Sequence, residues 1–202
     1  NLTMQNCIVQ RMTGTAIPYG AIVHYGAAEG TLTLKNTELI APVAGTADEI
    51  NSASPSVIGV AAWAQTGENI DEAWKLVVTD CTIRTNGFAV FDRWNNATYT
   101  NTTFTGLEGV EGLDDIEVKT CYMALNNPHA NDVTYDHCTF RNMRSWGMLV
   151  AGEELTVTDC TFDGTNQSCA ISVAYGTIDK CTITGTPLIG AAAAAELCSA
   201  AR

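Results

Sequence analysis

An eight-residue pattern recurs along the chain and restricts its fold more than any other feature. Residues 155–162 read LTVTDCTF, and seven other segments follow the same scheme. In all eight copies the third and eighth positions are apolar or aromatic, and six copies have Thr at the second position. The copies begin at residues 2, 32, 76, 97, 116, 133, 155 and 176. Such self-similarity indicates a repeat architecture, in which stacked units share one continuous core.

Within each copy the apolar residues alternate with polar ones, which is typical of a half-buried strand. In LTVTDCTF, Leu155 and Val157 face one side and the threonines face the other. The alternation shifts by one residue at Asp159, so Cys160 and Phe162 also face inward. Asn or Asp occupies this fifth position in most copies, and both residue types tolerate the left-handed backbone of a tight bend. Each copy therefore predicts two short strands joined by a corner.

A second apolar segment lies between most copies and predicts a third strand. These segments span residues 21–26, 56–63, 87–91, 146–152 and 169–176. One turn of about twenty residues cannot bury its own apolar face, whereas stacked turns bury it against one another. With parallel strands about 4.8 Å apart, eight turns would form a rod on the order of 40 Å long.

The repeated strand–bend–strand unit resembles the coil of the pectin lyase-like parallel β-helix superfamily, and the resemblance covers about residues 2–190. It implies an all-β chain, a right-handed single-stranded parallel β-helix of about eight turns. We expect residues 1–190 to form this solenoid, with loop excursions at 41–56 and 107–115. The Ala-rich segment 191–202 is expected to be a short helix, either a cap or a linker. The same coil serves lyases, glycosidases, tailspikes and adhesins, so it predicts the fold without the function.

Six of the eight cysteines share the sixth position of the repeat: Cys7, Cys81, Cys121, Cys138, Cys160 and Cys181. No Cys-x-x-Cys pair is present, which argues against a thiolate metal site. Equivalent positions on stacked turns predict a ladder of reduced, buried thiols, since Cys packs as a small apolar residue. Disulfides between turns remain an alternative, because neighbouring α-carbons would lie within bonding range, and so does a reactive thiol.

The charge and the ends of the sequence bear on partners and location. The formal net charge is −12, which argues against nucleic acid and anionic membranes as partners. No run of eighteen apolar residues exists, so we expect no membrane insertion by this segment. The sequence begins inside a repeat, at Asn1, and we interpret it as part of a longer secreted or cell-surface protein.

Acidic residues are concentrated in the segment LEGVEGLDD at residues 107–115. Its carboxylates belong to Glu108, Glu111, Asp114 and Asp115. Hard cations favour clusters of oxygen ligands, so these residues are a candidate Ca²⁺ site. A solvated acidic loop without a metal is the alternative interpretation, in which case the chain has no cofactor.

The resemblance also implies where catalytic residues would be sought. Superfamily lyases use Arg or Lys beside Ca²⁺, and pectinase-type glycosidases use an Asp pair followed by Gly-His-Gly and Arg-x-Lys. Asp114-Asp115 is similar to the Asp pair, but the other two motifs do not follow it. The candidate catalytic residues are Asp92, Arg93, Arg141, Arg144 and Asp114, and Trp94 and Trp146 are candidate sugar-binding platforms. Alternatively, these tryptophans only cover the ends of the core.

Two classes of function follow from these observations. The leading hypothesis is a non-catalytic stalk or adhesin that presents Thr-covered faces and binds a polysaccharide or a surface glycan. The alternative is a carbohydrate-active enzyme, either a polysaccharide lyase or a glycoside hydrolase. His24, His129 and His137 are interpreted as ordinary polar residues, and His137 stands at the corner that Asn or Asp holds in other copies.

Overall fold

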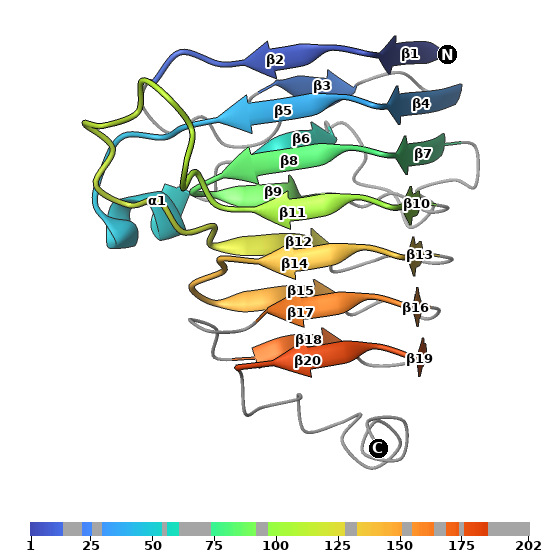
Figure 1. The fold of residues 1–202 in the computed structure, drawn as a ribbon. Helices are drawn as coiled ribbons and strands as arrows, with labels where there is room; N and C mark the ends of the chain where they lie inside the picture. Colours follow the sequence, from blue (N-terminus) through green and yellow to red (C-terminus); the bar gives the residue numbers. More distant parts are fainter. Residues whose placement is uncertain are drawn as a thin grey trace.

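The computed structural model describes residues 1–13, 22–25, 30–53, 56–60, 74–91, 97–127, 133–150, 155–163, 169–173 and 176–185. Within these residues the chain winds as a coil whose successive turns, here called rungs, stack into a rod (Figure 1). The expected Ala-rich helix at 191–202 lies outside the described residues, as does the predicted domain boundary near residue 190.

Three parallel sheets run along the rod, with seven, seven and six described strands, and the chain passes through them in turn. The first sheet contains β1 (Leu2–Gln5), β4 (Gly30–Lys35), β7 (Trp74–Thr79), β10 (Ala97–Thr100), β13 (Val133–Asp136), β16 (Leu155–Thr158) and β19 (Thr177–Asp179). The second contains β2 (Ile8–Gln10), β5 (Glu38–Ala41), β8 (Thr82–Thr85), β11 (Thr103–Thr105), β14 (Thr139–Arg141), β17 (Thr161–Asp163) and β20 (Thr182–Thr184). The third contains β3 (Val23–Tyr25), β6 (Ser56–Val60), β9 (Phe88–Phe91), β12 (Met123–Asn127), β15 (Trp146–Val150) and β18 (Cys169–Val173).

The register places equivalent repeat positions directly over one another. Leu32, at the first position of its rung, pairs with Leu2 on one side and Leu76 on the other. Phe140 pairs in the same way with Phe104 and Phe162. All these pairings are parallel, so the predicted all-β parallel β-helix is confirmed.

The corner between the first two sheets has the backbone that the phase shift predicts. The fifth residue of every rung has a positive φ, between 46° and 55°: Asn6, Asn36, Asp80, Asn101, His137, Asp159 and Lys180. The ladder of hydrogen bonds continues through the bend, since the amide of Asn36 donates to the carbonyl of Thr79 at 3.0 Å in the next rung. A single left-handed residue per rung therefore turns the chain without interrupting the stack.

The segment 116–123 does not form the rung that its sequence predicts. Strands β10 and β11 pair directly with β13 and β14, so the described chain has seven strands, not eight, in each of the first two sheets. Residues 116–120 lie in no strand, and Cys121 makes only an isolated bridge with Met143. The apolar residues of this segment are divided between two clusters, because Ile116 packs with Leu107 and Leu113 beside the rod, whereas Cys121 belongs to the core of the rod.

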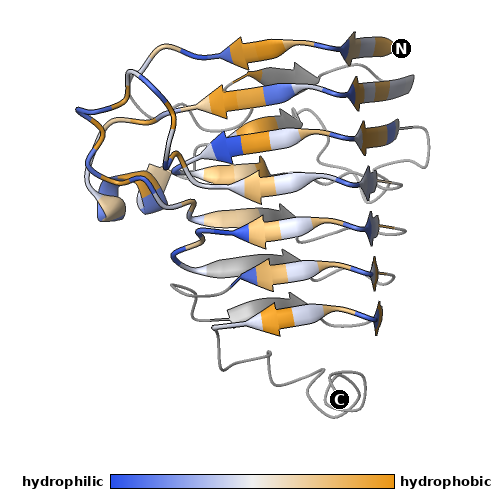
Figure 2. Ribbon diagram, viewed as in Figure 1, coloured by the Kyte–Doolittle hydropathy of each residue, from blue (hydrophilic) through white to orange (hydrophobic). Residues whose placement is uncertain are grey.

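The core of the rod is a set of stacked side chains, and apolar residues recur at matching places along the strands (Figure 2). The rings of Tyr99 and Tyr135 are parallel, with centroids 4.6 Å apart. Phe140 stacks on Phe104 at 5.0 Å and on Phe162 at 4.5 Å. All five rings are fully buried. Stacked aromatic pairs contribute about 0.5–1.5 kcal/mol beyond the burial of their area.

Two excursions from the coil pack together and form what we call the side lobe. It consists of α1 (Ala47–Ala53), with the residues leading into it, and of residues 106–120, which lie on the same side of the rod (Figure 1). The buried side chain of Asn86 bonds to the amide and carbonyl of Val43 at 2.9 and 2.8 Å, and to the carbonyl of Val118 at 2.9 Å. At Gly106 a Cβ atom would lie 2.2 Å from the carbonyl oxygen of Lys119, so only glycine permits this approach.

Candidate functional site

The outer edge of the corner carries a column of polar side chains, which we call the corner column. It consists of the seven fifth-position residues, all of them exposed or half-exposed. Asn36 donates from Nδ2 to Oδ1 of Asn6 at 2.9 Å, and Asn101 donates in the same way to Asp80 at 2.7 Å. The column therefore begins with amide-rich rungs and continues into rungs that carry His137, Asp159 and Lys180.

A shallow depression accompanies the amide-rich part of the corner column. It has a volume of about 380 Å³ and is lined by Asn6, Cys7, Ile8, Asn36, Thr37, Glu38, Asp80 and Thr82. Its walls combine amides, carboxylates and hydroxyls with the side chain of Ile8, which is 74% exposed. Glu38 is held in place by Arg84, whose Nε lies 2.6 Å from its Oε1. This surface offers donors and acceptors together with one apolar contact.

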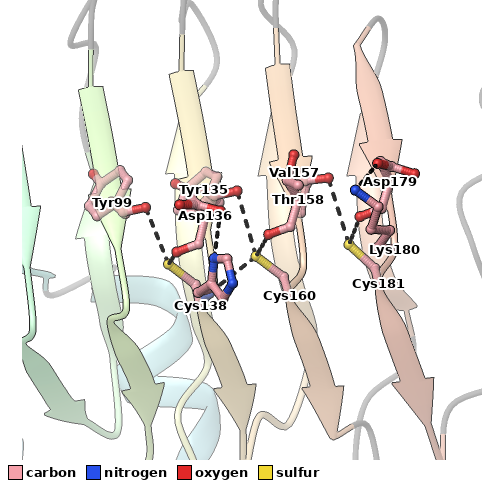
Figure 3. Close-up of polar contacts among 11 residues, drawn as sticks. Tyr99, Tyr135, Asp136, Cys138, Val157, Thr158, Cys160, Asp179, Lys180 and Cys181 are labelled. Atoms are coloured by element: carbon pink, nitrogen blue, oxygen red, sulfur yellow. Dashed lines mark hydrogen bonds and ion pairs between the residues drawn. The ribbon is translucent and has the colours of Figure 1, made fainter.

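Further along the column, two adjacent rungs bring a histidine and two aspartates together. Nδ1 of His137 lies 2.7 Å from Oδ1 of Asp136, the residue before it. Asp159 occupies the corner of the next rung, and one ligand atom from each of the three residues lies within 4.8 Å of the others. One rung beyond, Lys180 pairs with Asp179 at 3.2 Å, and this carboxylate raises the pKa of the lysine (Figure 3).

The sixth-position side chains lie just behind the corner and share one hydrogen bond. Each thiol donates to the carbonyl two residues earlier, at 3.1–3.5 Å, in Cys7, Cys81, Cys138, Cys160 and Cys181. Where this position is threonine, in Thr37 and Thr102, the hydroxyl makes the same bond at 2.9 and 3.0 Å. The common requirement is a small side chain with a hydrogen-bond donor, which explains why both Cys and Thr occur at this position.

The six cysteines at the sixth repeat position are all free, and three of the stacked thiols occupy consecutive rungs. The amide of Cys138 donates to Sγ of Cys160 at 3.3 Å, and contact with Cys138 together with burial raises the pKa of Cys160 to about 12. Cys121 does not belong to this column, because its thiol donates to the carbonyl of Gly87 at 3.3 Å. Burial raises the pKa of Cys121 to about 12. The predicted ladder of buried thiols is thus only partly formed: five cysteines share the column, Cys81, Cys138 and Cys160 of them are buried, and Thr37 and Thr102 interrupt the series.

The two arginines proposed as catalytic residues have different environments. Arg141 is exposed at the end of β14. Arg144 is turned into the side lobe, where it donates to the carbonyls of Asn86 (2.7 Å) and Thr120 and to Oδ1 of Asn51 (2.6 Å). Its guanidinium lies 5.2 Å from the ring centroid of Tyr122, and burial lowers its pKa. These contacts make Arg144 a tie between the rod and the side lobe.

The four acidic residues of segment 107–115 are exposed to solvent. The loop that carries them is anchored by the buried side chains of Leu107 and Leu113. Glu108 accepts a hydrogen bond from Asn142 at 3.3 Å. Among the described residues, only Asp136, His137 and Asp159 form a group of three possible metal ligands, so Glu108, Glu111, Asp114 and Asp115 do not converge. The Ca²⁺ site predicted for them stays an untested prediction, as does the catalytic role of Asp114.

The remaining predicted residues fall where the structure gives no side-chain description. Asp92, Arg93 and Trp94 lie outside the described residues, and Trp146 is described only as the first residue of β15. Asp136 and Asp159, by contrast, were missed by sequence reasoning although the repeat contained the signal. Aligned corner positions place Asp159 directly beside His137, and Asp136 precedes His137 in the chain.

Comparison with known proteins bears on the fold alone. A family model described as a right-handed β-helix region matches residues 1–196. No curated protein and no solved structure gives a significant match. In the described part of the chain, no helix combines the length and the apolar character needed to cross a membrane.

Proposed function

We propose, from the premise that this chain belongs to the right-handed β-helix family, that it is a non-catalytic segment of a larger secreted or cell-surface protein and binds glycans. In this role it acts as a stalk or adhesin, and the depression on the corner column is its binding surface. The observation that carries the proposal is this open depression of about 380 Å³, lined by Asn, Asp, Glu and Thr side chains.

The chemistry of the depression suits a polyhydroxylated ligand. A sugar presents hydroxyls that both donate and accept hydrogen bonds, and it presents apolar C–H faces. The amides of Asn6 and Asn36 can do both, the carboxylates of Glu38 and Asp80 accept, and Ile8 supplies an apolar contact.

The regular outer face of the rod supports a structural role beside this site. Thr98, Thr134, Thr156 and Thr177 are aligned in register on four successive rungs of the first sheet. Stacked rungs make a rigid, extensible rod, because each unit contacts mainly its neighbours. Such a rod holds a surface site at a fixed distance from its attachment point.

The proposal is tested by screening the chain against plant, microbial and host glycans, with and without Ca²⁺. We expect binding without turnover, and we expect the double variant Asn36→Gly/Asp80→Gly to abolish it, because both side chains line the depression. Glycine preserves the left-handed corner at these positions. The matched control is Lys180→Gly, which alters the same column four rungs beyond Asp80 and outside the depression.

Release of unsaturated or reducing sugar by the wild-type chain would contradict the non-catalytic role and favour a lyase or hydrolase. Equal glycan binding by the double variant and the control would show that the depression is not the binding surface. Binding to no glycan in the panel would contradict the adhesin role.

A further inference from the structure

We propose that Asp136, His137 and Asp159 form a binding site for a divalent transition-metal ion, which would join two consecutive rungs of the rod. This site lies on the corner column, beyond the residues that line the depression, and it is independent of glycan binding. It also differs from the acidic segment 107–115, because its ligands include an imidazole nitrogen.

The distances between the three groups suit first-row metals. Metal–nitrogen and metal–oxygen bonds of about 2.0–2.2 Å place neighbouring ligand atoms roughly 3 Å apart. Nδ1 of His137 and Oδ1 of Asp136 are 2.7 Å apart in a hydrogen bond, and a bound ion would replace the proton between them. One ligand atom from each of the three residues lies within 4.8 Å of the others, so binding an ion would draw the three groups together.

The backbone hydrogen bonds fix the positions of the Cα atoms of His137 and Asp159 relative to each other. The amide of His137 donates to the carbonyl of Thr158 at 3.0 Å, and the amide of Asp159 donates to the carbonyl of Asp179 at 3.1 Å. Both corner residues have a φ of 52°, so their Cα–Cβ bonds leave the rod in the same way, one rung apart. The two ligands from different rungs are therefore held side by side before any ion binds, which reduces the ordering cost of binding.

The charges favour a dication with nitrogen affinity. Two carboxylates and a neutral imidazole balance two positive charges, and imidazole favours Zn²⁺, Cu²⁺ or Ni²⁺ over Ca²⁺ or Mg²⁺. The neighbouring cation, Lys180, is paired with Asp179 at 3.2 Å and does not form an ion pair with Asp159 in the structure. The site stays exposed, so water completes the coordination and the ion can exchange.

The test uses Co²⁺ as the probe, added to the 202-residue chain and followed by calorimetry, visible absorption and the NMR signals of His137. We expect one ion per chain, nitrogen and oxygen ligation, and shifted resonances of His137. His137→Asn should weaken binding by at least about tenfold, the scale seen for changes around metal ligands. Asn is the natural corner residue at positions 6, 36 and 101, so this variant should keep the fold.

Asp159→Asn is a second variant that removes a ligand and leaves the corner intact, and it should weaken binding in the same way. The matched control is Asp80→Asn, which removes a carboxylate from the same column two rungs away from His137 and should leave the affinity unchanged. Equal binding by wild type and His137→Asn would overturn the site, as would no binding at millimolar Co²⁺. A thiolate-to-cobalt charge-transfer band would also overturn it, because the ion would then sit on the cysteines.

Discussion

The fifth residue of each rung carries the bend that turns two strands into a corner. Its φ near +50° strains a residue with a Cβ atom, and the chain relieves much of this cost by using Asn or Asp in five of the seven rungs. The other two rungs use His137, which also tolerates this conformation, and Lys180, which has no such local advantage. A corner that does not use Asn or Asp can carry a side chain with different chemistry. His137 is such a corner residue, and two carboxylates, those of Asp136 and Asp159, lie beside it.

The strain at the corner can be measured at Asn101. Its φ is 48°, and its side chain donates to Asp80 at 2.7 Å. Both Asn101→Gly and Asn101→Ala remove that hydrogen bond, but only alanine places a Cβ in the left-handed conformation. We expect the alanine variant to be less stable than the glycine variant by about 1 kcal/mol in urea unfolding. An alanine variant as stable as the glycine variant would show that backbone strain does not determine the choice of residue here.

At the scale of elements, the repeat predicts the two strands and the corner of each rung because those residues obey a local rule. Leu155, Val157 and Phe162 are buried as the alternation requires. The same rule fails at residues 116–123. There Ile116 packs against Leu107 and Leu113 rather than into the rod, and the local pattern does not encode this contact. That contact depends on which excursions the topology brings together, and a single sequence does not record it.

The candidate site was predictable to a similar extent. The alignment of repeats places His137 and Asp159 on one column, so their proximity follows from the register alone. The position of Arg144 does not, because its partners Asn51, Asn86 and Thr120 come from three distant segments. The sequence alone does not distinguish an arginine that faces a substrate from an arginine that attaches the side lobe to the rod.

Arg144 and Arg141 offer a matched test of how the side lobe is attached. Arg144→Met should destabilise the chain by about 1–3 kcal/mol, because it leaves the partly buried carbonyl oxygens of Asn86 and Thr120 without this donor. Arg141→Met removes an exposed charge and should change stability by less than about 0.5 kcal/mol. Hydrogen exchange should rise in residues 106–120 of the first variant only. Equal stability of the two variants would show that the lobe is held by its apolar contacts, without a contribution from the guanidinium.

At the scale of the whole molecule, the rod is close to a one-dimensional structure. Each strand hydrogen-bonds to its equivalents in the adjacent rungs, and the aromatic stacks follow the same direction. Stability should then be a sum of the contributions of single rungs and of contacts between neighbouring rungs. The proposed stalk role needs this property, because rungs can be added without redesigning the core. A surface site then involves only two or three neighbouring rungs.

The phenylalanine stack tests this additivity directly. Phe140 contacts both Phe104 and Phe162, at 5.0 and 4.5 Å, whereas Phe104 and Phe162 lie two rungs apart. In double-mutant cycles with leucine, the pair Phe104/Phe140 should show a coupling of about 0.5–1.5 kcal/mol.

The pair Phe104/Phe162 should be additive within about 0.5 kcal/mol, because the two rings share no contact and the effect of each substitution reaches only the adjacent rung. Unfolding free energies of the single and double variants supply both cycles. If Phe104 and Phe162 were coupled as strongly as the neighbours, packing changes would travel along the rod through Phe140. A ligand bound at one corner would then alter the stability of rungs it does not touch, and the proposed metal site and the proposed glycan site could not be independent.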